Sequence, residues 1–295
     1  MFNDIKTREV VVDIEGWINK AKSDPLKYTE RQATEIVLAT LGSTEPYCRK
    51  FFLKGGLLMG IVYDSPRQTA DIDYSTTLDP TPDLANKLEN KLNQAFPSVA
   101  ANLGYVDIIC KVQTIKHQPK VNGFEHARSP GYKITIGYAK RGEPQEKRLL
   151  RKEAATVLHI DISFKEPIGG MQIVKLKGSS GEFQAYSLED IIAEKFRALL
   201  QQEIRKRYRR QDIYDLVILL EKFSLDDTEK EQLLKLIHTK CKARGIAPKI
   251  NSLESVEIVR RAKSEWDTLR LELGDIPDFD YSFSIVNQFY RSLPW

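Results

Sequence analysis

Two aspartates separated by one residue give the strongest chemical signal in this sequence. Asp71 and Asp73 close the run Arg67-Gln-Thr-Ala-Asp-Ile-Asp73, which continues into strand-like residues. Side chains two apart on a strand point to the same side, so both carboxylates would be presented together. Carboxylates provide the hard oxygen ligands that Mg²⁺ prefers, and we expect this pair to bind the ion.

A diglycine lies about one helix earlier. The apolar run at 51–53 leads to Lys54, Gly55 and Gly56, and another apolar segment follows. Glycines at a strand-to-helix corner let backbone N–H groups approach a phosphate, and the helix N-terminus adds partial positive charge. A phosphate cradle beside metal-binding carboxylates suits a nucleoside triphosphate and indicates nucleotidyl transfer.

Two residues just upstream of the aspartates are further candidate phosphate contacts. Thr69 stands two residues before Asp71, so its hydroxyl would share the face of the carboxylates. Arg67 is similarly placed, with an ordinary surface position as the alternative.

Asp161 supplies a third candidate carboxylate. The segment 156–164 alternates apolar and polar residues, which predicts a strand with Asp161 on the polar face. Asp161 could complete the metal site or orient and deprotonate an attacking hydroxyl. The alternative is a solvent-facing residue on an edge strand. His159 shares this face, but a single histidine without a partner is more often structural, and we leave it out of the catalytic set.

Lys195 falls on the expected apolar stripe of a helix that begins at Leu188. An inward lysine must reach solvent or find an anion, and a triphosphate would be such an anion. The alternative is a structural ion pair with Asp212 or Asp215, which open the next helix on one face. Helix capping could explain both aspartates; otherwise Asp212 would reach the nucleotide site beside Lys195.

The positive charge is concentrated although the net charge is only +4. One stretch holds five basic residues in six positions, and a second runs from Lys140 to Lys152. Either could be a solvated helix face, but the first lies between candidate site segments and favours a polyanion such as RNA. The candidate RNA-binding residues are Arg205, Lys206, Arg207, Arg209 and Arg210.

Composition predicts a soluble globular protein, with 41% hydrophobic and 29% charged residues. The sequence contains no apolar run approaching the ~18 residues of a membrane span, and we expect neither membrane insertion nor secretion. Its three cysteines show no CxxC or CxH spacing, so we expect no disulfide framework or structural zinc site and a cytoplasmic location.

The elements that must position these residues change character near residue 185. We expect an α+β domain over 1–185 and a helical domain over 186–295, with Ser187 and Asp190 as a capping box at the start of the second. The predicted strands cover 71–76, 106–115, a hairpin around 132–138, and 156–164. The predicted helices cover 14–24, 29–42, 57–63, 83–95, 188–204, 211–223, 226–243 and 252–272, and 169–181 is predicted to be a glycine-rich loop.

Five ordered elements together resemble the AbiEii/AbiGii family of nucleotidyltransferase toxins, within the DNA polymerase beta-like superfamily. The resemblance covers roughly residues 30–222. The elements are Lys54-Gly55-Gly56, Arg67-x-Thr69-x-Asp71-Ile-Asp73, the Asp161 strand, Glu194-Lys195, and Asp212-Ile-Tyr-Asp215-Leu.

This resemblance implies a nucleotidyltransferase fold followed by a helical domain, and a partner antitoxin in a type IV toxin–antitoxin or abortive-infection system. It implies transfer from NTP to the 3′ end of tRNA in some members and GTP binding in others. Carried onto this sequence, it assigns phosphate contacts to Gly55, Gly56 and Thr69, Mg²⁺ binding to Asp71 and Asp73, and completion of the site to Lys195 and Asp212.

Two positions depart from the family pattern. Leu57 replaces the Thr or Ser that usually follows the diglycine, which leaves phosphate contacts to backbone N–H groups. Gln211 stands where a basic residue is common. Our first hypothesis is an Mg²⁺-dependent nucleotidyltransferase toxin that acts on RNA. The alternatives are the same chemistry on a small molecule or protein, and a non-catalytic nucleotide-binding module.

Overall fold

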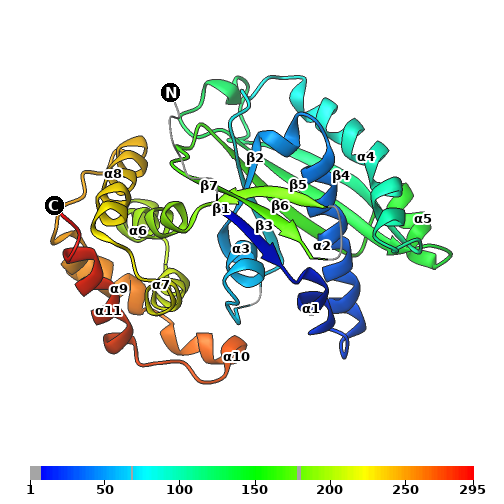
Figure 1. Cartoon of the computed structure of the whole chain (residues 1–295). Coiled ribbons are helices and arrows are strands. Elements are labelled where there is room, and N and C mark those ends of the chain that lie inside the picture. The colour runs from blue at the N-terminus through cyan, green and yellow to red at the C-terminus, as the bar shows by residue number, and fades with distance from the viewer. Residues whose placement is uncertain (1–7, 68, 178–180) are drawn as a thin grey trace. The chain divides into compact units, whose positions relative to one another are not determined.

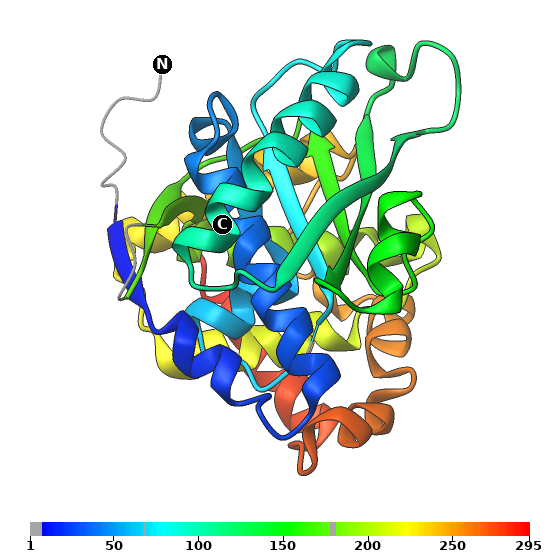
Figure 2. The same ribbon diagram turned by 90° about the vertical axis from the view of Figure 1, so that its right-hand side faces the viewer.

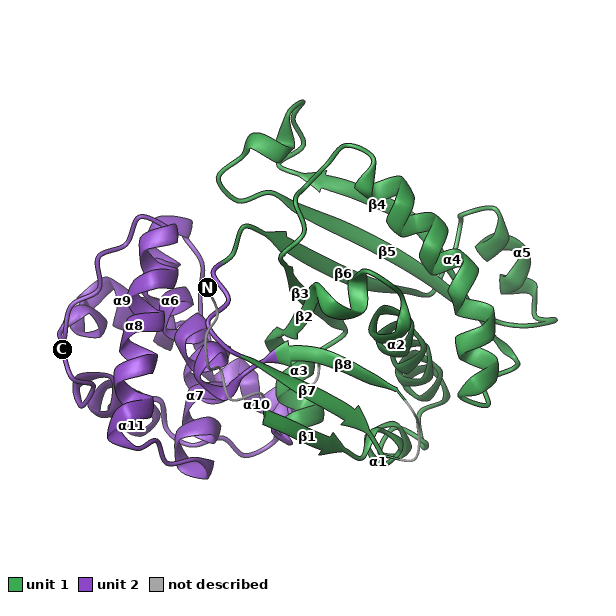
Figure 3. Ribbon diagram, turned by 45° about the horizontal axis from the view of Figure 1, so that its top comes forward, with its two compact units in different colours: residues 1–62, 69–166, 171–185 green, residues 63–68, 167–170, 186–295 purple. Residues whose placement is uncertain are grey.

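The computed structural model describes residues 8–67, 69–177 and 181–295 (Figure 1). The chain forms two compact units (Figure 3). Unit 1 comprises 1–62, 69–166 and 171–185, and unit 2 comprises 63–68, 167–170 and 186–295. The short segments 63–68 and 167–170 therefore belong to unit 2, although unit 1 residues flank both of them in the sequence.

Unit 1 is built on a mixed eight-stranded sheet in the order β1-β7-β8-β2-β3-β6-β5-β4. β3 and β6 pair in parallel, whereas β2 with β3 and β5 with β6 are antiparallel. This arrangement confirms the predicted α+β class. The strands are β1 (Arg8–Val12), β2 (Phe51–Lys54), β3 (Asp71–Thr76), β4 (Ile108–Gln118), β5 (Gly131–Lys140), β6 (Val157–Phe164), β7 (Met171–Leu176) and β8 (Glu182–Tyr186).

Helices of unit 1 begin at local signals and bury one apolar face. The Asp24 carboxylate accepts hydrogen bonds from the N–H groups of Leu26 and Lys27, with Pro25 in the first turn of α2 (Pro25–Ser43). Helix α4 (Leu84–Asn102) buries Leu84 and further apolar residues at helical spacing and packs on β4, and α2 packs on α4 (Figure 2). The remaining helices are α1 (Ile14–Asn19), α3 (Gly55–Val62) and α5 (Pro144–Leu150).

Unit 2 is a helical bundle around α6, which packs against α7, α8 and α9, while α11 packs on α7. The long helices of 188–243 agree with the predicted periodicity. None of the described helices is long and apolar enough to cross a membrane. The helices are α6 (Leu188–Arg205), α7 (Arg210–Lys222), α8 (Asp227–Ala243), α9 (Val256–Lys263), α10 (Arg270–Leu273) and α11 (Phe279–Arg291).

Three of the sequence-based predictions are wrong. The helix predicted over 252–272 is broken at Glu265, whose φ of +58° is left-handed, because Trp266 turns inward and donates its indole N–H to Pro277 O. The predicted loop at 169–181 contains β7. Ser187 caps α6, but the Asp190 carboxylate instead accepts from the N–H groups of Gly169 and Gly170, at 2.6 and 2.7 Å, so there is no capping box.

Candidate active site

The predicted carboxylates of unit 1 come together because their strands pair in register. Asp73 on β3 is opposite Asp161 on β6, and Asp71 precedes Asp73 on the same face. The same line continues to Lys54 on β2 and to Lys133 on β5. Four neighbouring strands therefore present a charge row of lysine, aspartate, aspartate and lysine. β6 is an inner strand, which excludes the edge-strand alternative for Asp161.

Gly55 is required where β2 turns into α3. Its φ is +73°, and a Cβ atom there would lie 2.3 Å from Asp73 Oδ2. The backbone of the diglycine thus approaches the carboxylate of Asp73 closely, which only glycine permits. Gly56 lies in the first turn of α3, and Leu57 is buried in the core.

Asp73 has the most perturbed carboxylate of the charge row. Burial is the main cause that raises the pKa of Asp73 to about 6; Lys54 opposes the change, and the negative charges of Asp161 and Asp71 add to it. Mutual repulsion of this kind is relieved by a bound cation.

The donor set fits Mg²⁺ only as part of a larger coordination shell. No group of three or more histidine, cysteine or carboxylate side chains within the described ranges could by itself hold a metal ion. Mg²⁺ is commonly bound by one or two carboxylates with water and substrate phosphates. The in-register pair of Asp73 and Asp161, with Asp71 beside it, provides oxygen donors of this kind.

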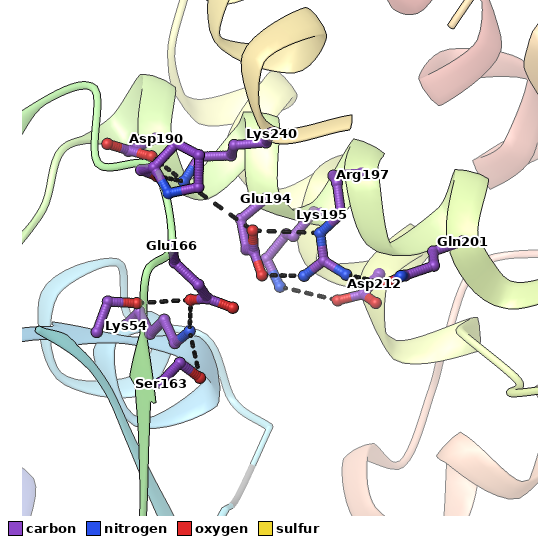
Figure 4. A network of polar contacts seen from close by, with 12 residues as sticks. Lys54, Ser163, Glu166, Asp190, Glu194, Lys195, Arg197, Gln201, Asp212 and Lys240 are labelled. Carbon is purple, nitrogen blue, oxygen red and sulfur yellow. Dashed lines mark hydrogen bonds and ion pairs between the residues drawn. The ribbon is translucent and has the colours of Figure 1, made fainter. Parts of the chain in front are cut away.

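Lys54 already has carboxylate and hydroxyl partners within unit 1 (Figure 4). Its ammonium pairs with Glu166 and donates to Ser163 Oγ at 3.4 Å. Ser75 Oγ donates to Glu166 at 2.6 Å. Sequence analysis missed Glu166, because a lone glutamate after a strand has no spacing signal. Thr69 Oγ1 accepts from the Asp71 N–H at 3.3 Å. The predicted phosphate contacts of Lys54 and Thr69 stay predictions.

In unit 2, Lys195 and Arg67 share the carboxylate of Asp215. Lys195 Nζ lies 2.6 Å from Asp215 Oδ2 and 3.4 Å from Asp212 Oδ1. The Arg67 guanidinium donates to both oxygens of Asp215, at 3.3 and 3.0 Å. Lys195 thus makes the structural ion pairs given above as the alternative to a nucleotide contact. Arg67 is likewise paired within unit 2, with Asp215. Their predicted contacts with a nucleotide stay predictions.

Charge on Asp215 is stabilised although the side chain is fully buried. Burial alone would raise the pKa of Asp215, but Lys195 and Arg67 outweigh it and hold the pKa below its ordinary value. Asp212 differs, since its Oδ2 is buried and accepts no hydrogen bond from the described residues. Arg209 lies 3.6 Å from that oxygen. Asp212 is therefore incompletely satisfied.

A second buried charge cluster of unit 2 holds the segment 167–170 (Figure 4). Lys240 pairs with Asp190 and donates to Pro167 O at 2.8 Å. Lys240 and Asp190 are both almost completely buried. The cluster is structural and lay outside the predicted site.

The basic segment at 205–210 divides into two kinds of residue. Arg205, Lys206 and Arg207 are exposed, and no ion-pair partner is found for them in the part of the chain that the structure describes. Arg205 has a lowered pKa, because of partial burial and the repulsion of neighbouring arginines. Arg209 and Arg210 instead lie near Asp212 and Glu265, at 3.6 and 3.1 Å.

Comparison with known proteins gives a family match over most of the chain. The family described as nucleotidyl transferase AbiEii toxin, type IV TA system, matches residues 36–284. No curated protein sequence matches the chain.

Two solved structures share the fold. JHP933 from Helicobacter pylori has a TM-score of 0.50 and 14% identity, and the match covers 92% of each chain. The nucleotidyltransferase toxin MenT4 from Mycobacterium tuberculosis H37Rv has a TM-score of 0.53 and 13% identity, with 94% of this chain and 88% of that chain covered. At these identities the likeness shows the fold.

Proposed function

Because the chain belongs to the AbiEii family of type IV nucleotidyltransferase toxins, we propose that it transfers a nucleoside monophosphate from an NTP to RNA. The proposed acceptor is the 3′ end of the tRNA acceptor stem. The observation that carries the proposal is the in-register pair of Asp73 and Asp161, with Asp71 on the same face.

In the proposed reaction, the terminal 3′-hydroxyl oxygen attacks the α-phosphorus of the NTP. A new bond forms between that oxygen and phosphorus, the bond from the α-phosphorus to the bridging oxygen breaks, and pyrophosphate leaves. The hydroxyl proton passes to a carboxylate, either Asp73 or Asp161. Asp71, Asp73 and Asp161 would hold Mg²⁺ together with water and substrate phosphate oxygens, and the ion would neutralise phosphate charge and make the hydroxyl more acidic.

We assign the direct phosphate contacts to the backbone N–H groups of Gly55 and Gly56 and to the Thr69 hydroxyl. Lys54 and Arg67 already have the partners Glu166 and Asp215, so we assign them a longer-range electrostatic contribution.

Lys195 and Asp212 are proposed to take part in the same reaction. Lys195 would stabilise the leaving pyrophosphate at longer range, like Lys54 and Arg67, because its ammonium already pairs with Asp215 and Asp212. The buried Oδ2 of Asp212 accepts no hydrogen bond from the residues that the structure describes, which supports a second role toward the nucleotide.

The decisive experiment measures transfer of label from each α-labelled NTP to total tRNA. Three variants, Asp71→Asn, Asp161→Asn and Lys195→Met, each remove one charged side chain of the proposed site. Each should lower transfer by at least about 100-fold, because the lost charge would stabilise the transition state more than the bound substrates. His159→Ala is the matched control, since His159 is exposed and in register with Asp71 but lies outside the proposed set. It should retain transfer.

Wild-type-like transfer by Asp71→Asn and Asp161→Asn would overturn the proposed site. Label that enters protein extract or an aminoglycoside, and not tRNA, would overturn the RNA acceptor while leaving nucleotidyl transfer in place.

The proposed RNA contact rests on the unpaired part of the basic segment. Each phosphate contact to a single strand contributes about 0.7 to the slope of log K against log salt. A variant with Arg205, Lys206 and Arg207 changed to Gln should therefore lower the slope by roughly 2. Changing the paired Arg209 and Arg210 to Gln should lower it by less than about 1. Equal slopes in both variants would contradict the assignment.

We also propose a cognate antitoxin protein as partner, because the family belongs to type IV toxin–antitoxin systems. Its expression should restore growth to cells that produce the toxin. The cytoplasm is the proposed compartment, supported by the free thiols of Cys48, Cys110 and Cys241.

A further inference from the structure

Lys54 is a buried cation placed directly beside the candidate catalytic carboxylates. It is opposite Asp73 on the neighbouring strand, and Asp73 is in turn opposite Asp161. Opposite residues on paired strands have their side chains on the same face within contact range. Lys54 is 8% exposed, so its ammonium cannot turn into bulk water. The ammonium must therefore pair with a carboxylate inside the unit.

Glu166 provides that carboxylate from the residues that follow β6. It pairs with Lys54, and Ser75 Oγ fixes the Glu166 carboxylate through a hydrogen bond of 2.6 Å. Ser163 accepts from the same ammonium at 3.4 Å. Ser75 and Ser163 are opposite each other, two residues along the strands from the Asp73 and Asp161 pair and therefore on the same face. The lysine is thus held beside the carboxylates by a dedicated set of partners.

We propose that Glu166 is a positioning residue that holds the Lys54 ammonium off Asp73 and Asp161 and so keeps both carboxylates open to a divalent cation. The inference rests on the proposed function, in which these aspartates bind the metal.

The Lys54 ammonium and a metal ion would compete for the same carboxylate oxygens, which explains why Lys54 needs a partner of its own. A buried ammonium without a counter-charge is strongly unfavourable, and Asp73 and Asp161 would be its nearest replacements. An ammonium that donates to these oxygens occupies the lone pairs that a metal ion requires. Lys133, at the other end of the charge row, lies 3.6 Å from Asp161 Oδ2, but its side chain is 55% exposed, so a metal ion can displace its ammonium into solvent.

The test is a titration of Mn²⁺ by electron paramagnetic resonance, with a non-hydrolysable NTP analogue present, so that binding is read without turnover. Glu166→Gln keeps the size and hydrogen-bonding groups of the side chain but removes its charge. We expect about tenfold weaker Mn²⁺ binding, the size of effect typical of residues that support metal ligands. Ser75→Ala, which removes the hydrogen bond from Ser75 Oγ to Glu166, should weaken binding by roughly two- to threefold.

The double variant Lys54→Met with Glu166→Gln distinguishes positioning from general support of the fold. The nucleotide analogue is kept at a saturating concentration, so that loss of the long-range contribution of Lys54 to nucleotide binding does not affect the result. With no ammonium left to compete, the Mn²⁺ affinity should return to within about threefold of wild type, whereas damage to the fold would persist. Glu35→Gln is the matched control, because it neutralises another buried carboxylate of unit 1, which accepts from the Tyr105 hydroxyl at 2.6 Å. It should bind Mn²⁺ like wild type.

Wild-type affinity in Glu166→Gln, or no recovery in the double variant, would overturn the inference. If the wild-type protein binds no Mn²⁺ with the nucleotide analogue, the proposed metal site itself is wrong, and the inference falls with it. If Glu166→Gln fails to fold, Ser75→Ala and the double variant decide the question by the same two comparisons.

Discussion

At the scale of single residues, the fully buried aspartates of unit 2 each have more than one positive or N–H partner. Asp215 accepts from Arg67 and Lys195, and Asp190 accepts from two backbone N–H groups and pairs with Lys240. A buried carboxylate with several partners keeps its charge at a low energetic cost. Removal of that charge leaves its positively charged and N–H partners buried without an acceptor.

Asp215→Asn should therefore destabilise the protein far more than the loss of an exposed ion pair. We expect a loss of about 3 kcal/mol in the free energy of unfolding, because the buried Arg67 loses its counter-charge and Lys195 keeps only the more distant Asp212. Asp280→Asn is the control, since Asp280 pairs with Lys263 at the surface, at 2.9 Å, and should cost less than about 0.5 kcal/mol. Urea denaturation measures both, and equal losses would show that Asp215 is not structurally important.

Glu35 gives the protein a defined dependence on pH. Burial raises the pKa of Glu35 above 4.5, Glu15 adds to the shift, and the hydrogen bond from Tyr105 opposes it. The folded state then binds this proton more tightly than the unfolded state, so stability falls as pH rises from below the unfolded pKa through the folded pKa.

Glu35→Gln cannot ionise and should escape that loss. The stability of the variant relative to wild type should rise as the pH increases from below 4.5 through the raised pKa of Glu35, measured as the difference in urea midpoints. A difference that stays constant with pH would contradict this account.

At the scale of elements, periodicity predicted where the helices and strands of the site lie but not what their side chains contact. The strand predicted over 71–76 matches β3, and the helices of 188–243 follow their apolar stripes. The strands β1, β7 and β8 were missed, because they pair with strands far away in the chain or with each other. Glu166 had no local signal for the same reason, and Arg67 finds Asp215 across 148 positions.

Gly55→Ala tests whether the corner between β2 and α3 is shaped by Asp73. The left-handed φ of Gly55 would cost about 1–2 kcal/mol with any other residue, and the added Cβ atom would also displace the Asp73 carboxylate. Gly104→Ala is the control, because Gly104 has a similar φ of +82° and no atom within 4 Å of the added Cβ. Both variants should lose similar stability, but only Gly55→Ala should lose nucleotidyl transfer. Loss of transfer in both would contradict the assignment.

At the scale of the whole molecule, the chain passes between the two units several times. Residues 63–68 and 167–170 belong to unit 2 although unit 1 residues surround them in the sequence. Arg67 is held by Asp215, and Gly169, Gly170 and Pro167 are held by Asp190 and Lys240.

A fragment of residues 186–295 should therefore fail to fold as an independent unit. It would lack the guanidinium that shares Asp215 and the two N–H groups that donate to Asp190 Oδ2. We expect a broad, non-cooperative thermal transition by circular dichroism, in contrast to the full chain. A sharp transition of the fragment would show that segments 63–68 and 167–170 contribute little to the stability of unit 2.

The same crossings bear on how this protein can be inherited. Recombination at the boundary near residue 185 would exchange most of the helical unit but leave 63–68 and 167–170 with the parent that supplied the sheet. The hybrid would have to match an arginine from one lineage to an aspartate from another, in a buried position that tolerates no mismatch. Horizontal transfer should therefore move this gene whole, and its two units should share one ancestry.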